Sequence, residues 1–159
     1  MKLMICGYAR HGKDTFCELL GLPFISSSMA ALEAVIWPAW GERHYRTPEE
    51  CFEDRGAHRE KWFELITAYN AHDRAKLGKY IYSRCDVYCG IRNQEEFFAL
   101  KNGGHFDLSI WVDASGRKPQ EDTSSNTMKP EYCDMIVHNN GTLDDLKRVA
   151  NVLRQFKQG

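Results

Sequence analysis

The sequence lacks any long apolar run. No stretch approaches the roughly 18 consecutive apolar residues that a membrane-spanning helix needs. The amino terminus also lacks the extended apolar core of a secretory signal peptide. We therefore expect a cytosolic protein that has no membrane partner.

An excess of one charge sign and a zinc-type cysteine pattern are also absent. The formal net charge is -1, which differs from the global basic excess of many nucleic-acid binders, although a local basic patch remains open. The six cysteines are Cys6, Cys17, Cys51, Cys85, Cys89 and Cys133. Cys85 and Cys89 have no second Cys or His pair at ligand spacing, so the pattern favours reduced structural thiols over a zinc site.

Internal repeats, low-complexity tracts and domain linkers are missing as well. The chain has 159 residues and is 43% hydrophobic, which is enough to bury a substantial core in one compact domain. We therefore expect a single domain over residues 1–159.

The most informative stretch is Gly7–Thr15, which follows an apolar run at Leu3–Cys6 and precedes helical spacing at Phe16–Leu20. A glycine-rich turn between a strand and a helix binds phosphate, because backbone N–H groups converge there and the helix N-terminus adds positive potential. The spacing is the G-x-x-x-x-G-K of a P-loop, which predicts that Lys13 reaches the β and γ phosphates of a nucleotide. The alternative is a chance glycine turn with a solvated lysine, and the flanking strand and helix disfavour it.

One position departs from the general P-loop pattern. A serine or threonine usually follows the lysine and binds magnesium, but here Asp14 follows it and Thr15 comes next. A carboxylate beside a polyphosphate is repulsive unless a cation lies between them, so Asp14 itself indicates Mg²⁺. We expect Asp14 and Thr15 to bind the metal, with ATP and Mg²⁺ as cofactors. The expected ATP-binding residues of the loop are Gly7, Ala9, Arg10, His11, Gly12, Lys13, Asp14 and Thr15.

A second short strand is expected at Leu22–Ile25, followed by three serines at positions 26 to 28. These serines can cap a helix that begins near Met29 and ends at Pro38. Contact with the phosphate acceptor is the alternative role for them.

The segment from about residue 39 to residue 82 is dense in charged and aromatic residues and is the expected acceptor-binding helical segment. Thr47 and Pro48 predict a helix start. If that helix continues, four residues at i, i+3, i+4 and i+7 share one face. They are Arg55, His58, Arg59 and Trp62. This cationic and aromatic face suits a phosphate and a base, and a face of structural salt bridges to nearby acids is the alternative.

Asp86–Ile91 is the best candidate for the central strand, and Arg92 follows it directly. In an open α/β sheet, ligands bind beyond the carboxyl ends of the strands, which would place Arg92 beside the P-loop. An arginine there can bind a transferring or accepting phosphate through two nitrogens. Asn93 is the expected cap of the helix that follows. In the alternative, Arg92 lies at this helix start and pairs with Glu95 or Glu96.

The longest turn-rich stretch, residues 114–130, follows an expected strand at Phe106–Val112. A polar loop of this length in a compact domain is more often a working lid than a plain connection, and Arg117 and Lys118 would be the cations that it brings onto ATP. A merely mobile loop is the alternative. The last strand is expected at Cys133–Val137, before a turn at Asn139–Thr142.

Nearly the whole chain resembles the small phage-type deoxynucleoside monophosphate kinases, within the nucleotide-kinase group of P-loop proteins. The resemblance is carried by Gly7–Thr15, by the Gly90–Asn93 turn with acids after it, and by Asp134–Thr142. It implies an α/β protein with a three-layer α/β/α P-loop kinase fold, a mostly parallel five-stranded sheet, a helical acceptor segment and a short lid. The family's magnesium motif on the central strand is not evident, since Cys89 and Gly90 stand there.

The resemblance also implies roles for single residues. Arg92 would hold the acceptor phosphate and Arg117 would belong to the lid. The turn that contains Asn140 and Gly141 would pass near adenine.

Three functions are compatible with these residues. The first is transfer of the γ-phosphoryl group of ATP to a deoxynucleoside monophosphate, with Lys13, Asp14, Arg92 and Arg10 as catalytic residues. The second is phosphorylation of the hydroxyl of 5-hydroxymethyluracil in phage DNA, where Asp14, Asp113 or His58 would be the base. The third is a nucleotide-binding regulator. The near-neutral charge favours the first, in the host cytoplasm if a phage encodes the protein, and the sequence leaves a homodimer open.

Overall fold

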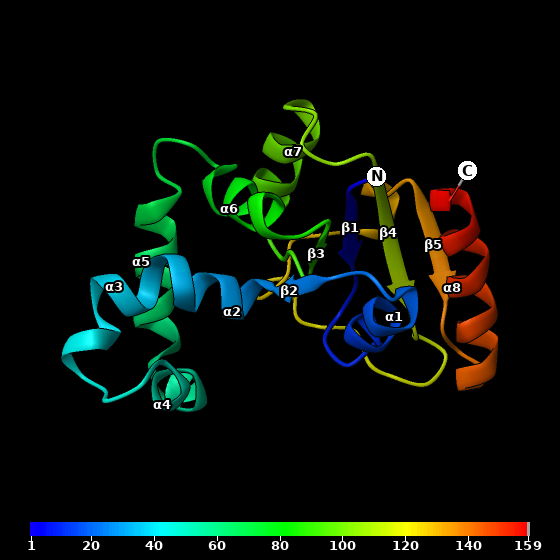
Figure 1. Ribbon diagram of the computed structural model, residues 1–159. Coiled ribbons are helices and arrows are strands. Elements are labelled where there is room, and N and C mark those ends of the chain that lie inside the picture. The colour runs from blue at the N-terminus through cyan, green and yellow to red at the C-terminus, as the bar shows by residue number, and fades with distance from the viewer. Residues whose placement is uncertain (159) are drawn as a thin grey trace.

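The computed structural model describes residues 1–158, and its centre is a five-stranded sheet in the order β2-β3-β1-β4-β5 (Figure 1). The strands are β1 (Leu3–Cys6), β2 (Phe24–Ser26), β3 (Val87–Cys89), β4 (Leu108–Asp113) and β5 (Met135–His138). All four strand pairs are parallel, so the carboxyl ends of all the strands lie at the same edge of the sheet. The predicted five-stranded sheet is confirmed.

The predicted central position of Asp86–Ile91 is wrong. β3 lies between β2 and β1, and β1 occupies the centre. Every residue of both β1 and β3 is buried, so burial and apolar content alone could not distinguish the two positions.

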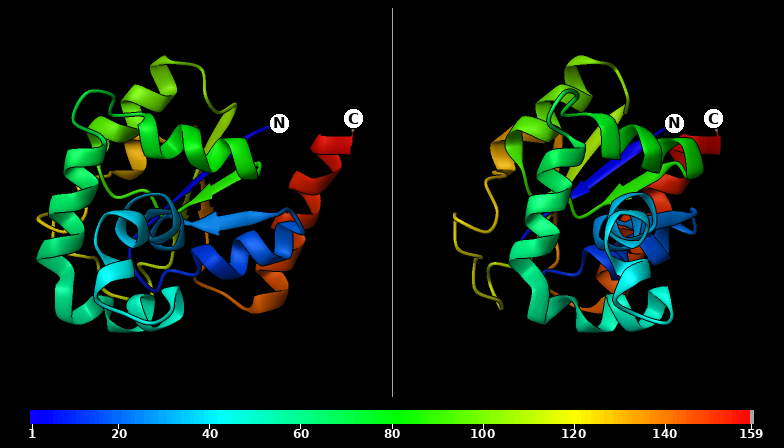
Figure 2. Two further views of the ribbon diagram at one scale, coloured as in Figure 1. Left: turned by 60° about the vertical axis from the view of Figure 1, so that its left-hand side comes forward. Right: turned by 90° about the vertical axis from the view of Figure 1, so that its left-hand side faces the viewer.

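The helices cover both faces of the sheet (Figures 1 and 2). They are α1 (Lys13–Leu20), α2 (Ser27–Ala31), α3 (Trp37–Ala39), α4 (Pro48–Glu53), α5 (Arg59–Tyr69), α6 (Lys76–Arg84), α7 (Gln94–Asn102) and α8 (Leu143–Gln158). A π-helical turn, Leu32–Ile36, joins α2 to α3, and short 3-10 turns lie at Gly41–Arg43, Asp54–His58 and Pro130–Tyr132. Within residues 1–158, no helix has the length and apolarity needed to cross a membrane.

Two separate cores show that the domain has three layers. Successive residues of a strand point to opposite faces, so Leu3 and Ile5 pack in one core while Met4 and Cys6 pack in the other. The first core contains buried residues of α1 and α8, such as Leu146. The second core is closed by α2, α6 and α7.

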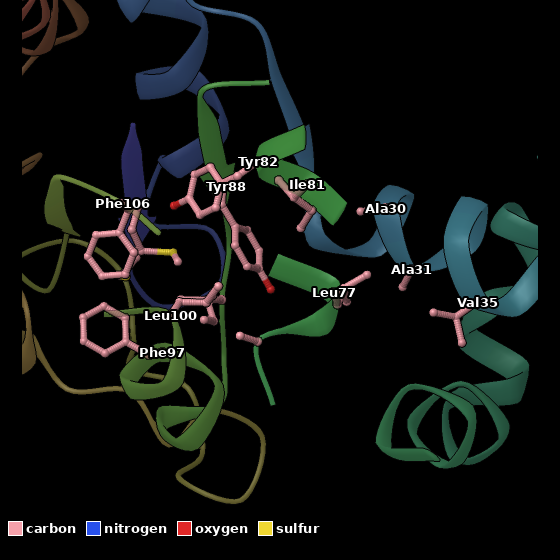
Figure 3. Close-up of a cluster of buried hydrophobic side chains, with 14 of the residues drawn as sticks. Ala30, Ala31, Val35, Leu77, Ile81, Tyr82, Tyr88, Phe97, Leu100 and Phe106 are labelled. Carbon is pink, nitrogen blue, oxygen red and sulfur yellow. The ribbon is translucent and has the colours of Figure 1, made fainter. Parts of the chain in front are cut away.

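Figure 3 shows this second core, in which Tyr82 and Tyr88 lie between the sheet and the helices. A Cβ atom on Gly78 of α6 would lie 2.5 Å from the Leu100 side chain of α7. The glycine therefore allows these two helices to approach each other closely.

The helix starts follow the predicted capping chemistry. The Thr47 side chain accepts a hydrogen bond from the Glu50 N–H (3.2 Å), and the Asn93 side chain accepts from the N–H groups of Glu95 and Glu96. Ser26 caps the helix after β2 by accepting from Met29 N–H, so one serine of the three acts as predicted.

The helix that begins at Ser27 does not stop before Pro38. It continues through the π-helical turn and α3 as far as Ala39. A π-helical turn widens the backbone, and Pro38 stands in the first turn of α3, where a missing N–H costs little. Figures 1 and 2 show that α3, α4 and α5 gather in a lobe on the β2 side of the sheet.

Candidate functional site

The P-loop lies between β1 and α1, and two of its positions require glycine. Gly7 and Gly12 have φ values of 149° and 95°, in the left-handed region that side chains disfavour. A Cβ atom on Gly7 would also lie 2.6 Å from the carbonyl oxygen of Val112. Gly12 is the N-cap of α1, so the unpaired N–H groups of this helix start face the same loop and form an anion site.

Arg10 is the one residue other than glycine with a positive φ, 64°, in the described part of the chain. Its side chain is exposed. A left-handed conformation costs roughly 1 kcal/mol for a residue with a Cβ atom. The loop therefore keeps a cation at this position against a backbone preference for glycine.

Lys13 lies across the loop and is largely buried. Its Nζ donates to the carbonyl oxygen of Tyr8 at 2.8 Å. Burial lowers the pKa of Lys13, and the positive charge of Arg92 lowers it further. Two cations thus lie close together, and an anionic ligand would relieve their repulsion.

His11 connects the P-loop to the segment predicted as a lid. The ring is fully buried. Its Nδ1 accepts from the Ala114 N–H and its Nε2 donates to the Pro119 carbonyl oxygen, both at 2.9 Å. Asn139, just after β5, donates from Nδ2 to the His11 carbonyl oxygen at 3.0 Å. The side chain predicted to bind ATP therefore holds the loop against the lid segment, and the His11 carbonyl group holds it against the residue after β5.

A carboxylate from the lid segment lies on the P-loop. Glu121 Oε1 is 2.7 Å from Arg92 Nη1, and Oε2 accepts from Asn126 Nδ2 at 2.9 Å. The Ala9 N–H also donates to Glu121, and Lys13 adds attraction. Burial opposes ionisation, but these contacts hold the pKa of Glu121 below its usual value. Arg92 therefore pairs with Glu121 rather than with Glu95 or Glu96.

The lid segment is anchored at both ends. No helix or strand lies in residues 114–129. Near its start, Arg117 Nε donates to the Asn139 carbonyl oxygen and Gly116 N–H donates to Asn140 Oδ1, both at 2.8 Å. Near its end, Thr127 N–H donates to the Arg92 carbonyl oxygen at 2.9 Å. The structure thus brings Arg117 beside Asn140 and the adjoining Gly141, as an ATP-binding role for the three would require.

Asp14 and Thr15 are exposed in the first turn of α1. Cys89 Sγ donates to Asp14 Oδ1 at 3.3 Å, which directs the carboxylate toward the end of β3. No group of three or more His, Cys, Asp and Glu side chains able to hold a metal occurs in the described residues. One carboxylate with a neighbouring hydroxyl fits Mg²⁺, which takes few protein ligands and completes its shell with phosphate oxygens and water.

A cavity of about 470 Å³ lies beside the P-loop. It is lined by Ser27, Ser28, Ala31, Trp62, Phe63, Ile66, Thr67, Asn70, Ala71, Arg74, Leu77, Tyr88, Gly90, Arg92, Asn93, Glu96, Ser124, Ser125 and Thr127. Gly90 joins the two sites, because a Cβ atom there would lie 3.9 Å from Lys13 Cε. Ser27 Oγ donates to the Gly90 carbonyl oxygen at 3.2 Å, so the serines after β2 form part of this wall.

Of the four residues predicted on one acceptor face, only Trp62 lines this cavity. The prediction of one shared helical face is wrong, because α4 ends at Glu53 and α5 begins only at Arg59. His58, between them, has a non-helical backbone. The break separates Arg55 and His58 from the face of α5 that carries Trp62, while Arg59 lies in the first turn of α5 but does not line the cavity.

Two of these residues lie against other partners. Arg55 Nη1 donates to the Phe52 carbonyl oxygen at 2.9 Å, and His58 Nε2 is 3.3 Å from Asp54 Oδ2. Arg55, His58 and Arg59 belong to a separate surface between α4 and α5, and the last two line a second hollow there. Their role in acceptor binding stays a prediction from the sequence.

Two charged residues of the cavity were not predicted as site residues. Arg74 precedes α6 and forms an ion pair with Glu95 at 2.5 Å. Glu96 is partly buried, and its Oε1 accepts a hydrogen bond from the Tyr88 hydroxyl at 2.7 Å. Burial raises the pKa of Glu96 to about 7. Their positions depend on contacts between distant segments, and spacing along the chain gave no sign of them.

Comparison with known proteins gives the fold. No protein family and no curated protein matches the sequence. Among solved structures, TT1252 from Thermus thermophilus is similar with a TM-score of 0.57 and 20% identity, over 100% of this chain and 98% of that one. Shikimate kinase from Aquifex aeolicus vf5 is similar with a TM-score of 0.52 and 14% identity, over 99% and 98%. The chain has a P-loop kinase fold.

The P-loop kinase fold confirms the predicted fold class, including the parallel sheet and the position of the phosphate loop after β1. In a parallel α/β sheet the ligand site lies beyond the carboxyl ends of the strands, and both the P-loop and Arg92 lie there. The narrower resemblance to phage deoxynucleoside monophosphate kinases stays a prediction.

Proposed function

We propose that this protein is an ATP-dependent phosphotransferase that moves the γ-phosphoryl group to a deoxynucleoside monophosphate. The observation that carries the proposal is the adjacency of two sites. The P-loop with Lys13 and the cavity with Trp62 and Arg92 meet at Gly90. One site suits a polyphosphate and the other suits a phosphate joined to a flat base.

On the donor side, backbone N–H groups of the P-loop and the Lys13 ammonium bind the β and γ phosphates. Arg117, Asn140 and Gly141 lie together at the ends of β4 and β5, where they contact the nucleoside part of ATP. Asp14 and Thr15 would hold Mg²⁺, which would supply positive charge to the phosphate oxygens.

On the acceptor side, Arg92 binds the phosphate of the monophosphate. A phosphate oxygen attacks the γ-phosphorus in line, and the bond to the β,γ-bridging oxygen breaks to release ADP. Lys13 and Arg92 stabilise the charge on the equatorial oxygens, with Arg10 at the edge of the loop. The acceptor oxygen is already anionic, so this transfer needs no strong base.

A hydroxyl acceptor, such as 5-hydroxymethyluracil in DNA, would need a general base. Burial alone would raise the pKa of Asp113, but hydrogen bonds from Ser115 and His138 keep it below its usual value, which makes it a weak base. His58 does not line the acceptor cavity. These observations disfavour Asp113 and His58 as that base, whereas an anionic phosphate acceptor needs none.

The decisive experiment is transfer from γ-labelled ATP with Mg²⁺ to a panel of all deoxynucleoside and ribonucleoside monophosphates. DNA with and without 5-hydroxymethyluracil is included. Label in one or more diphosphates supports the proposal. Label on the modified DNA alone contradicts it and makes the protein a DNA-modifying kinase, while binding of ATP without transfer indicates a regulator.

Glu121 competes with phosphate for Arg92 and the Ala9 N–H, so Glu121→Gln should strengthen ATP binding. We expect the Kd for ATP to fall by about 3-fold to 10-fold, as for loss of a partly exposed competing ion pair. Isothermal titration calorimetry measures it. Glu131→Gln, at an exposed position outside the site, is the control. Weaker ATP binding in Glu121→Gln would instead mean that the carboxylate holds the loop in its binding conformation.

A further inference from the structure

One acidic side chain contacts both the P-loop and a residue of the acceptor cavity. Glu121 Oε1 lies 2.7 Å from Arg92 Nη1, and Arg92 lines the cavity. The same carboxylate accepts a hydrogen bond from the Ala9 N–H of the P-loop. Its contacts therefore join two places that have separate ligands in the proposed function, the donor phosphates on the loop and the acceptor phosphate on the arginine.

The charges around this carboxylate form one cluster. Burial lowers the pKa of Lys13, the charge of Arg92 lowers it further, and the charge of Glu121 opposes both. The Glu121 side chain is only 15% exposed, so solvent and salt screen the cluster weakly. One negative charge thus offsets two positive charges, as a phosphate group at the junction of the two sites would.

Other contacts hold the chain that follows this carboxylate. The Thr127 N–H donates to the Arg92 carbonyl oxygen, and Thr127 Oγ1 accepts from the Gln94 N–H, both at 2.9 Å. The cavity lining from this stretch is Ser124, Ser125 and Thr127. The carboxylate can therefore leave by rotation of its own side chain, while this part of the cavity wall stays in place.

We infer that Glu121 couples the two sites. The carboxylate closes both of them, and whichever ligand displaces it opens the other site for the second ligand. The inference rests on the proposed function, because it concerns the donor and the acceptor of that transfer. Glu121 acts through Arg92 and the Ala9 N–H and does not touch the reacting atoms, so it is a positioning residue.

Either phosphate displaces the carboxylate by the same physical effect. The γ-phosphate of ATP takes the Ala9 N–H and places negative charge beside the carboxylate, which weakens its pairing with Arg92. The acceptor phosphate takes Arg92 and repels the carboxylate from the P-loop. The first ligand loses the free energy of the broken Glu121 contacts, and the second ligand binds to a site that is already open. Such coupling is reciprocal, so each ligand strengthens the binding of the other by the same factor.

A single ratio, that of closed to open protein, then sets three measurable factors. The apparent Kd of a ligand exceeds its intrinsic Kd by the reciprocal of the open fraction. Glu121→Gln removes the charge that closes the sites, so the Kd for ATP and the Kd for the acceptor should both fall, each by about 3-fold to 10-fold. The coupling that depends on Glu121 in the wild type should have the same value.

The test is isothermal titration calorimetry with Mg²⁺ and the non-hydrolysable imido analogue of ATP. The Kd of the analogue is measured without and with each nucleoside monophosphate of the panel, and the Kd of each monophosphate without and with the analogue. The two bound ligands repel each other in every variant, so the quantity compared is the coupling factor of the wild type divided by that of Glu121→Gln. We expect a quotient of about 3 to 10.

Glu95→Gln is the matched control. Glu95 forms an ion pair with Arg74, the other arginine of the cavity, at 2.5 Å. This variant therefore removes an acidic charge at the cavity and leaves the Glu121 contacts in place, so it should keep the wild-type coupling factor. Loss of coupling in both variants overturns the inference, because the effect would then follow from any loss of acidic charge there.

Hydrogen exchange of residues 122–128 separates coupling from a purely structural role. The backbone contacts of Thr127 do not involve the carboxylate, so exchange in Glu121→Gln should match that of the wild type. Faster exchange in the variant overturns the inference, because the carboxylate would then hold the cavity wall itself.

The binding data distinguish failure of the inference from failure of the proposed function. If Glu121→Gln binds the ATP analogue more tightly but not the monophosphate, the carboxylate closes the P-loop alone and the inference is wrong. Equal coupling in the wild type and Glu121→Gln overturns it as well, and both results leave the kinase function intact. Binding of no monophosphate to any variant contradicts the proposed function, and the inference fails with it.

Discussion

Lys13→Ala should reduce phosphoryl transfer by on the order of 10³-fold or more, because it removes a charge directed at the transferring phosphate. The Lys13 ammonium is largely desolvated, and a charge acts more strongly where water is excluded. The measurement is kcat/KM with saturating Mg²⁺ and the best acceptor of the panel.

The stability of the same variant separates lost chemistry from lost folding. Burial lowers the pKa of Lys13, which means that folding disfavours its charged form at neutral pH. That cost is present below the folded pKa and vanishes when the lysine is removed, so Lys13→Ala should melt at the same temperature or higher. Lys147→Ala, in α8, is the control and should keep full activity. Substantial transfer by Lys13→Ala would contradict the assignment of this P-loop.

His11→Ala should destabilise the protein by about 3 kcal/mol, since it empties a fully buried site and leaves two backbone groups unpaired. The Ala114 N–H and the Pro119 carbonyl oxygen lose their partner, so residues 114–130 should detach from the P-loop. We expect weaker ATP binding and faster proteolysis of this segment.

Urea unfolding measures the loss of stability, and limited proteolysis followed by mass spectrometry locates the cleavage sites. His72→Ala, at an exposed position, is the control and should change neither. If His11→Ala loses stability but residues 114–130 stay protected, the histidine supports the P-loop alone and does not hold the lid segment.

Features that depend on a few neighbouring residues were predictable from the sequence. The P-loop, the capping roles of Thr47 and Asn93, and the approximate positions of the strands all follow from local chemistry. The position of Arg92 beside the P-loop also followed, because the carboxyl ends of parallel strands share one edge.

Features that depend on contacts between distant segments were not predictable. The order of β1 and β3 in the sheet, the pairing of Arg92 with Glu121 and the exposure of Glu96 to the cavity are of this kind. The helix break before Arg59 had a local signal, because Gly56 disfavours a continuous helix there. This local backbone preference outweighs the i, i+3, i+4 and i+7 spacing of the four side chains.

The Glu121 carboxylate, which lies on the P-loop, affects which anions the loop can bind. Any anion that binds there must displace Glu121 from Arg92 and from the Ala9 N–H. Chloride or inorganic phosphate makes few contacts and gains little by this exchange. A triphosphate chain contacts the whole loop and gains much more. In the proposed function, the Glu121 contacts therefore lower the affinity of the loop for every anion, and a triphosphate, with its many contacts, tolerates that loss better than a small anion does.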